Sequence, residues 1–228
     1  ASTMTDEEQL DVIKCIVDTV NKRIPVIAGA STNDTRHSLS LAKGAQDMGA
    51  DALLIITPYY NKANRTGLKA HFKAIADAVD LPIILYNVPS RTGVNIAPDL
   101  VAELANECEN IVAIKEASGD IAQVAEVARL VPDDFAIYSG NDDSITPLLS
   151  LGGSGVISVL ANVCPRQTHD LVAKFLDGDV KGSCKIQLDL KALIDALFIE
   201  VNPVPVKTAL NLLGFEVGHL RLPLGEMN

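Results

Sequence analysis

A lysine interrupts the otherwise apolar run IVAIKEA, where Lys115 stands among residues typical of a buried β-strand. Lysine is almost never fully buried without a partner or a task, because removing its ammonium from water is costly. One interpretation is a structural ion pair with the neighbouring Glu116. Successive strand residues point to opposite faces, however, so Glu116 is poorly placed to neutralise this lysine. The other interpretation is a catalytic amine, and the pattern alone leaves both open.

The chemistry available to such a lysine is that of a Schiff base. Surroundings of low polarity lower the pKa of a lysine from about 10.4 and leave a neutral amine that attacks a ketone. The resulting iminium acidifies the adjacent carbon and yields an enamine able to add to an aldehyde. A tyrosine hydroxyl can move the protons at the carbinolamine stages.

Three of the four tyrosines fall near the ends of apolar runs: Tyr59 and Tyr60 follow LLIITP, and Tyr86 is in PIILYN. Active sites of parallel α/β proteins collect at the carboxyl ends of strands. An isolated tyrosine there is more often a locally bonded structural residue, but three together favour a site. Arg91 in NVPSRTG is expected on the same face, where its guanidinium can hold a carboxylate with two parallel hydrogen bonds.

The elements that must position these residues alternate between strands and helices. A capping box of Thr5 and Glu8 predicts a helix start, and helical spacing continues at 68–79 and 121–131. The last part of the chain carries helical patterns only, including 188–199 and 206–213. Near-continuous apolar runs, typical of strands covered on both faces of a parallel sheet, recur at 24–28, 52–57, 82–88, 111–117, 135–139 and 156–161.

This α/β alternation fits an open doubly wound sheet or a (β/α)8 TIM barrel. A whole barrel has eight strands and typically about 250 residues. Six strands in 228 residues therefore predict a barrel lacking its first two strands, with an appended C-terminal helical region. We expect the partial barrel at 1–165, and the last barrel helix with the helical region at 166–228.

Composition argues against several classes of protein. A net charge of −10 without a basic stripe predicts no nucleic-acid partner. Apolar runs such as 52–56 are far shorter than the about 20 residues that cross a bilayer, so no membrane partner is expected. The cysteines lack CxxC spacing and the histidines form no HxxH or HExxH pattern. We therefore expect a reduced, cytoplasmic protein with no metal and no cofactor.

A glycine cluster, GGSG at 152–155, invites comparison with a phosphate-binding loop. It precedes the strand expected at 156–161, so it belongs at the opposite end of a barrel from the chemistry. We interpret it as a tight turn between a helix and a strand.

The run YNVPSRTG from Tyr86, followed by IVAIKEASG around Lys115, resembles the two-part signature of the dihydrodipicolinate synthase and N-acetylneuraminate lyase family. ITPYYN, GVISVLANV and NPVPVK also match in order and spacing, so the resemblance extends over essentially the whole chain. It implies that two further strands and a glycine-rich motif with paired threonines precede Ala1. It also implies a final helix after Asn228.

The resemblance further implies a class I lyase in lysine and diaminopimelate biosynthesis. Its substrates would be pyruvate and L-aspartate 4-semialdehyde, its product 4-hydroxy-tetrahydrodipicolinate, and its assembly a homotetramer built as a dimer of dimers. Lys115 would form the Schiff base, Tyr86 would relay protons, and Tyr60 would reach into a neighbouring subunit. The residues that would hold the second substrate or line its pocket are Arg91, Gly140, Ile157 and Asn162.

Two alternatives remain. N-acetylneuraminate lyase and other pyruvate-dependent aldolases keep the Schiff base and change the aldehyde. Arg91 favours the synthase, because the sugar-acid lyases lack an arginine at that position. A non-catalytic barrel that binds a small acid is the other alternative, and it requires Lys115 to be a structural cation.

The resemblance also implies an inhibitory lysine site at a dimer interface. Asn33 and Tyr59 fit the sensitive pattern, whereas His37 replaces an acidic residue that faces the effector's ammonium. Losing that charge-assisted hydrogen bond predicts weak or absent inhibition. The matching positions in this sequence are Ser2, Met4, Asp6, Gln9, Asn33, His37 and Tyr59.

Overall fold

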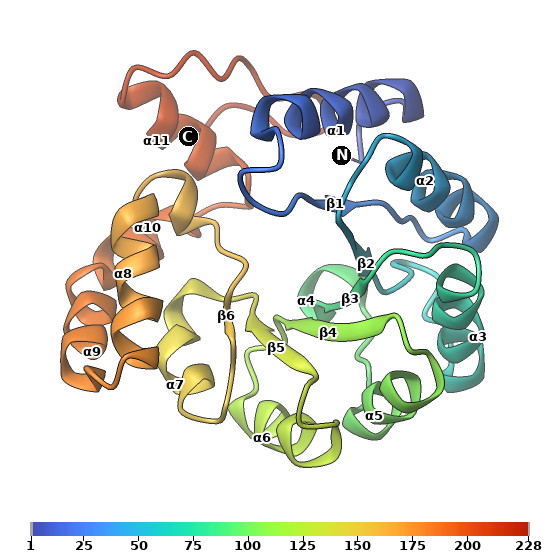
Figure 1. Cartoon of the computed structure of the whole chain (residues 1–228). Helices are drawn as coiled ribbons and strands as arrows, with labels where there is room; N and C mark the ends of the chain where they lie inside the picture. Colours follow the sequence, from blue (N-terminus) through green and yellow to red (C-terminus); the bar gives the residue numbers. More distant parts are fainter. Residues whose placement is uncertain (1, 228) are drawn as a thin grey trace. The chain divides into compact units, whose positions relative to one another are not determined.

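The computed structural model describes residues 2–227, and the chain divides into two compact units, Ala1–Tyr138 and Ser139–Asn228. In the first unit, helices follow strands in regular alternation (Figure 1). Its elements are α1 (Asp6–Val20), β1 (Ile27–Gly29), α2 (Thr35–Asp47), β2 (Ala52–Ile56), α3 (Arg65–Ala76), β3 (Ile83–Asn87), α4 (Pro89–Thr92), α5 (Pro98–Glu107), β4 (Ile111–Glu116), α6 (Ile121–Leu130) and, ending at the boundary, β5 (Ala136–Ser139).

Strands β1 to β5 lie in the sheet in chain order, and β1 to β4 pair in parallel. The second to fifth predicted strands are confirmed to within two residues. The first is shorter than predicted, because Ile24 is exposed and Pro25 has no amide to donate. Ordered pairing begins at Val26, whose amide donates to the carboxylate of Asp51 at 2.8 Å.

Helix boundaries follow their capping residues. The predicted capping box of α1 is confirmed: the Glu8 amide donates to the Thr5 hydroxyl, and the Thr5 amide donates to the Glu8 carboxylate. Helix α6 starts after Asp120, whose carboxylate accepts from the amides of Ala122 and Gln123, and it ends two residues before Pro132.

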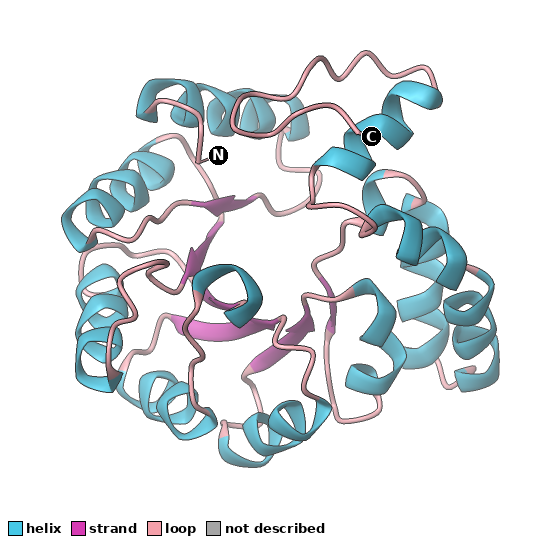
Figure 2. Ribbon diagram, turned by 180° about the vertical axis from the view of Figure 1, so that it is seen from behind, coloured by secondary structure: helices cyan, strands magenta, loops and turns pink. Residues whose placement is uncertain are grey.

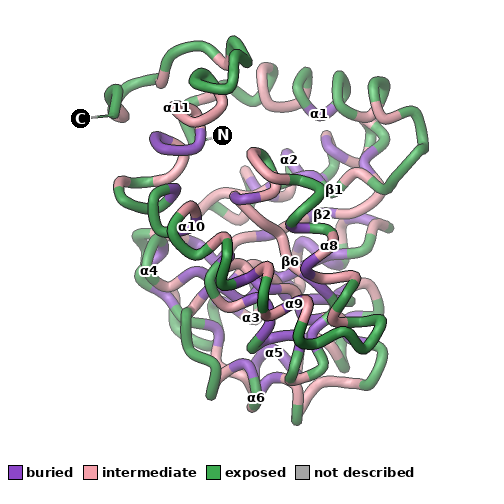
Figure 3. The backbone as a smooth tube through the Cα atoms, turned by 90° about the vertical axis from the view of Figure 1, so that its left-hand side faces the viewer, coloured by how far each residue is buried: buried purple, intermediate pink, exposed green. Residues whose placement is uncertain are grey.

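The core of the first unit lies between its strands and its helices. Strands and flanking helices are distinguished in Figure 2, and buried backbone is purple in Figure 3. Helix α1 buries only Ile13, so most of its surface is accessible. The largest side chains with almost no exposure include Phe72, Leu53, Ile55, Ile75, Ile83, Leu85, Leu100 and Ile114.

A buried imidazole joins α2 to α3. His71 of α3 is 3% exposed, and its Nδ1 lies 2.9 Å from the hydroxyl of Thr35 at the start of α2. Burial lowers the pKa of His71 to about 4, so the ring is neutral at physiological pH. The first turn of α2, which carries His37, is therefore held by an uncharged hydrogen bond.

The second unit is mainly helical and has two hydrophobic clusters, one around Leu160, Ile194 and Leu197 and one around Ile145 and Leu171. The predicted helix at 188–199 is wrong in its bounds, because the chain breaks at Leu190 between two helices. Its elements are η1 (Asp142–Ser144), α7 (Ile145–Leu149), β6 (Gly155–Val156), η2 (Leu160–Asn162), α8 (Pro165–Leu176), α9 (Val180–Asp189), α10 (Lys191–Leu197) and α11 (Val204–Leu212).

The strand predicted at 156–161 is mostly wrong, because only Gly155–Val156 is a strand. The Ile157 amide still donates to the carbonyl of Ser139, at 2.9 Å. The carboxylate of Asp142 then accepts from the amides of Val159 and Leu160, at 3.0 and 2.8 Å, and turns the chain into a 3-10 helix. A buried acceptor outside the segment thus outweighs the strand propensity of its apolar residues.

The glycine cluster forms the predicted turn between a helix and a strand. Gly152 has φ +90°, in the left-handed region that favours glycine. A Cβ on Gly153 would lie 2.1 Å from the Leu148 side chain, so the close approach of the chain to α7 also requires glycine.

Candidate active site

Lys115 of β4 and Tyr86 of β3 lie opposite each other on neighbouring strands. They are register partners near the carboxyl ends of β4 and β3. Partners in a parallel ladder share a face of the sheet, so both side chains project to the same side. The structure therefore brings together the amine and the hydroxyl that the sequence predicts for one site.

A register irregularity makes this pairing possible. Ile83 is opposite Ile111, whereas Ile84 is opposite Ala113, so β4 has one extra residue at Val112. An unbroken ladder would pair Tyr86 with Ile114 and turn Lys115 to the other face. The extra residue thus puts the lysine on the face of the tyrosine.

The Lys115 ammonium nitrogen Nζ lies over the aromatic ring of Tyr86, 4.2 Å from its centroid. Both side chains are half-buried. A cation over the face of a tyrosine is attracted by the ring quadrupole, typically by about 0.5–2 kcal/mol. The contact therefore orients the lysine side chain toward the tyrosine.

The hydroxyl of Tyr86 retains its proton at neutral pH. Burial raises the pKa of Tyr86, and the positive charge of Arg91 opposes that rise. The phenol is therefore protonated at neutral pH. Arg91 is on the short helix α4, directly after β3, and the arginine side chain is exposed.

Glu116 is directed away from this pair. It is only 3% exposed, and its carboxylate accepts hydrogen bonds from Asn87, Gln123 and the amide of Ser118. The alternation expected from the sequence is therefore present, with Lys115 and Glu116 on opposite faces of β4. Sequence reasoning weighed Glu116 only as a counter-ion and missed this buried cluster, although a second charge in the apolar run was its signal.

Tyr60 is 88% exposed. Its backbone has φ +71°, which is uncommon for a residue with a side chain and is a source of local strain. The Tyr60 amide donates to the carbonyl of Thr92 at 3.3 Å, so the segment after β2 is bound to the end of α4. The ring is thus held outside the unit.

Three predicted pocket residues belong to the second unit. Gly140 is half-buried directly after β5, Ile157 follows β6, and Asn162 ends η2 with an exposed side chain that donates to the carbonyl of Val159. Sequence reasoning missed Asp142, which organises this segment from a position 2% exposed. The roles of these residues stay predictions.

A cavity of about 310 Å³ opens in the first unit between α1, the start of α2 and the end of β2. The seven positions that the resemblance assigns to an effector site line this cavity, and that role stays a prediction: Ser2, Met4, Asp6, Gln9, Asn33, His37 and Tyr59.

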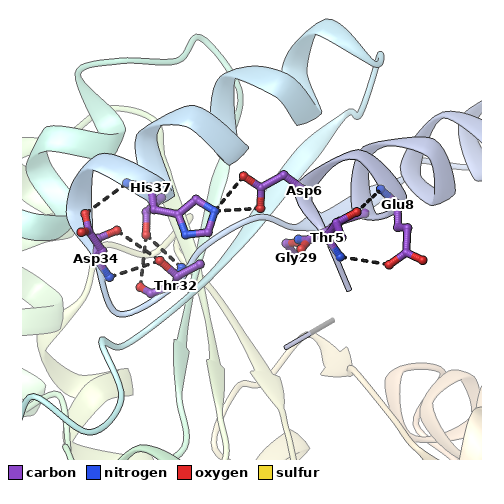
Figure 4. Close-up of polar contacts among 9 residues, drawn as sticks. Thr5, Asp6, Glu8, Gly29, Thr32, Asp34 and His37 are labelled. Carbon is purple, nitrogen blue, oxygen red and sulfur yellow. Dashed lines mark hydrogen bonds and ion pairs between the residues drawn. The ribbon is translucent and has the colours of Figure 1, made fainter. Parts of the chain in front are cut away.

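A hydrogen-bonded contact between two side chains crosses the wall of this cavity. His37 Nε2 of α2 lies 2.8 and 2.9 Å from the two carboxylate oxygens of Asp6 of α1 (Figure 4). The His37 amide also donates to Asp34, the N-cap of α2, and the Arg36 and His37 amides lower the pKa of Asp34. The Asp6 carboxylate is therefore already engaged by the imidazole.

Among residues 2–227, no cluster of three or more histidine, cysteine, aspartate or glutamate side chains is arranged to hold a metal ion. Within the same residues, no helix combines the length and apolar character needed to span a membrane.

Parallel strands that present a lysine and a tyrosine side by side near their carboxyl ends are typical of the active sites of α/β enzymes. The chain belongs to the dihydrodipicolinate synthetase family, whose family model matches residues 1–228.

Individual relatives agree with this assignment. A 4-hydroxy-tetrahydrodipicolinate synthase of Acetivibrio thermocellus is 60% identical over 227 residues, which are 100% of this chain and 77% of the relative. A crystal structure of the Cyanidioschyzon merolae synthase with lysine bound has a TM-score of 0.97 and 41% identity, covering 100% of this chain and 77% of that one. A chloride-inhibited synthase of Acinetobacter baumannii, complexed with pyruvate, has a TM-score of 0.96 and 44% identity, with 100% and 78% covered.

Proposed function

We propose that this protein condenses pyruvate with L-aspartate 4-semialdehyde through a Schiff base at Lys115, giving 4-hydroxy-tetrahydrodipicolinate for lysine and diaminopimelate biosynthesis. The observation that carries the proposal is the register pair of Lys115 and Tyr86, with the amine 4.2 Å from the ring centroid. Pyruvate in the Acinetobacter relative and the name of the Acetivibrio relative support the same reaction.

The reaction begins when the neutral amine of Lys115 attacks the ketone carbon of pyruvate. Tyr86 donates a proton to the carbinolamine oxygen, which leaves as water and forms the iminium. Loss of a proton from the methyl carbon gives an enamine, and this carbon attacks the aldehyde carbon, whose oxygen takes up a proton and becomes the hydroxyl of the product while the iminium is restored. The amino group of the second substrate then displaces Lys115 from the iminium carbon and closes the ring.

We also propose that β1 to β6 are six of the eight strands of a (β/α)8 barrel, since relatives of this fold align with the whole chain. We propose a cytoplasmic homo-oligomer in which Tyr60 completes the proton relay of a partner subunit. The 88% exposure of Tyr60 supports that role, because a ring without cover in its own unit is available to a neighbour.

The reaction is tested by trapping. Sodium borohydride with pyruvate should reduce the imine to a stable adduct, and peptide mass spectrometry should locate it on Lys115. A protein without this adduct would contradict the proposal and favour a non-catalytic binding protein. Faster turnover of sialic acid or a keto-sugar acid than of aspartate semialdehyde would favour the lyase alternative.

Arg91→Lys should mainly weaken use of the aldehyde. Lysine keeps the positive charge but loses the planar fork that binds a carboxylate with two hydrogen bonds. We expect kcat/KM for aspartate semialdehyde to fall about tenfold or more, with KM for pyruvate changed less than about threefold. Steady-state kinetics with each substrate varied in turn would measure both. Unchanged kinetics for the aldehyde would exclude this role for Arg91.

L-Lysine should inhibit weakly, with half-inhibition above about 1 mM. Asp6 in the cavity is engaged by His37 at 2.8 Å, so an effector ammonium must compete for that carboxylate. His37→Glu should tighten inhibition about tenfold, because it adds a carboxylate to the cavity. Activity assays with added L-lysine would measure both effects.

The neutral variant His37→Gln is the matched control and should leave inhibition near the wild-type level. Half-inhibition of the wild-type protein at about 0.1 mM or below would require roughly 5.5 kcal/mol of binding. That result would show that the cavity already provides a full ammonium site around Asp6.

A further inference from the structure

A buried polar cluster lies on the face of β3 and β4 opposite to Lys115 and Tyr86. Asn87 and Glu116 form the next rung of the ladder after the lysine and tyrosine. Asn87 is 0% and Glu116 is 3% exposed, and the Asn87 amide Nδ2 donates to Glu116 Oε2 at 3.0 Å. Each partner thus directly follows one of the two proposed reacting residues in the chain.

The donors of this cluster converge on the Glu116 carboxylate. Besides Asn87, the Ser118 amide donates to Oε1 at 2.7 Å, and Gln123 Nε2 of α6 donates to Oε2 at 3.0 Å. A carboxylate accepts at both oxygens, whereas a glutamine would turn an amide donor toward at least one of these donors. The cluster is therefore specific for an acceptor-only side chain at position 116.

The cluster also holds the segment that follows α4. Asn87 Oδ1 accepts from the Ile96 amide at 3.0 Å, and Asn87 Nδ2 lies 2.8 Å from Asn95 Oδ1. Asn95 in turn donates to Gln123 at 2.7 Å. The same few side chains thus fix the ends of β3 and β4, the start of α6 and the chain that leaves Arg91.

We propose that Glu116 is a positioning residue for the Schiff-base reaction, an inference that rests on the proposed function of Lys115 and Tyr86. The strands are already joined by backbone, since the Ala117 amide donates to the Asn87 carbonyl at 2.8 Å. A buried charge is weak grounds for stability, because apolar replacements of buried polar clusters are often neutral or stabilising. We infer that Glu116 fixes the pairing of β3 and β4, so that the Lys115 amine and the Tyr86 hydroxyl keep their relative positions. Such positioning matters because productive geometry tolerates displacements of only about 0.5 Å.

Glu116→Gln in the full protein tests this role. We expect kcat to fall about 10- to 100-fold while KM for pyruvate changes less than about threefold, because misalignment affects the chemical steps more than binding. Kinetics and thermal unfolding should be measured together. A lower unfolding temperature with unchanged kcat would reduce Glu116 to a structural residue and overturn the proposal.

A second substitution that restores the hydrogen bonds tests whether their geometry, rather than the charge at position 116, sustains turnover. The double variant Gln123→Glu with Glu116→Gln exchanges donor and acceptor between these two side chains, keeps the cluster's net charge and leaves an amide oxygen at position 116 to accept from the Ser118 amide. It should regain at least about tenfold of the turnover lost in Glu116→Gln. Turnover no higher than that of Glu116→Gln alone would overturn the proposal that this hydrogen-bonded cluster sets the geometry.

A milder variant keeps the proposal falsifiable if Glu116→Gln does not fold. Gln123→Met removes one donor to Glu116 and should lower kcat about three- to tenfold. The matched control is Gln46→Met, because Gln46 is also half-buried and its side chain accepts a hydrogen bond, at 2.8 Å, from the Asp80 amide. The Gln46→Met variant should have the kcat of the wild type. Equal kcat values for the two methionine variants would overturn the proposal.

Borohydride trapping of wild-type protein with pyruvate tests the Schiff base at Lys115 separately from the positioning role of Glu116. Without an adduct at Lys115, the proposed function fails and Glu116 has no reaction to position. With the adduct present, wild-type kcat in both Glu116→Gln and Gln123→Met would overturn the positioning role alone. Reduced kcat in both variants, with the adduct still formed at Lys115, supports it.

Discussion

Lys115→Ala should lower kcat/KM for the condensation by at least about 10³, to the limit of detection, because the proposed covalent intermediate forms on this amine. Alanine removes the nucleophile without leaving a charge in the sheet. Turnover should be measured with pyruvate and aspartate semialdehyde, and the borohydride adduct should be absent. Retained turnover within about tenfold of wild type would refute a Schiff base at this residue.

The fold of the Lys115→Ala variant should be largely intact. The contact with the Tyr86 ring that it loses is typically about 0.5–2 kcal/mol, which corresponds to only a few degrees of unfolding temperature in a chain of this size. Lys73→Ala is a matched control, since Lys73 is half-exposed on α3 with a long 3.8 Å ion pair to Asp77. It should keep wild-type turnover and still form the adduct at Lys115.

The sequence indicates which residues are candidates to react but not how they come together. Tyr86 and Lys115 are recognisable because polar groups stand out in apolar strands, and apolar runs locate strands to within a few residues. Their pairing depends on the extra residue of β4 at Val112, which shifts the register after Ile83. Nothing local to Val112 marks it, because register follows from how whole strands pack.

Residues distant in the sequence explain other differences between the predicted and the observed elements. Asp142 accepts from Val159 and Leu160 and ends β6 after two residues, although Ile157 and Val159 are good strand formers. The two partners of each hydrogen bond are 17 and 18 residues apart, so the residues of the predicted strand and their close neighbours do not reveal the interaction that ends it.

The same limit applies to the cluster around Glu116. Its members come from β3, β4, α6 and the segment after α4, and a sequence shows them only as scattered amides and acids. Burial and hydrogen-bond direction, which exist only in the folded chain, identify Glu116 as an acceptor rather than a surface charge. Local patterns thus predict elements and reactive groups, while long-range contacts set their geometry.

Tyr86→Phe should lower kcat about 10²- to 10³-fold while changing KM for pyruvate less than about threefold, as expected when a general acid is lost. Phenylalanine keeps the ring under the Lys115 ammonium, so the packing and the cation–π contact at 4.2 Å survive. The change therefore isolates the hydroxyl, whose raised pKa keeps it protonated at neutral pH.

The adduct itself distinguishes a proton relay from a binding role. In Tyr86→Phe, borohydride should still trap pyruvate on Lys115, only more slowly, because the amine remains and the loss of water from the carbinolamine lacks its acid. Steady-state kinetics and the time course of trapping by intact mass would measure both. A variant with normal kcat and a KM raised in proportion to the lost kcat/KM would show that the hydroxyl binds pyruvate and that the proton comes from elsewhere.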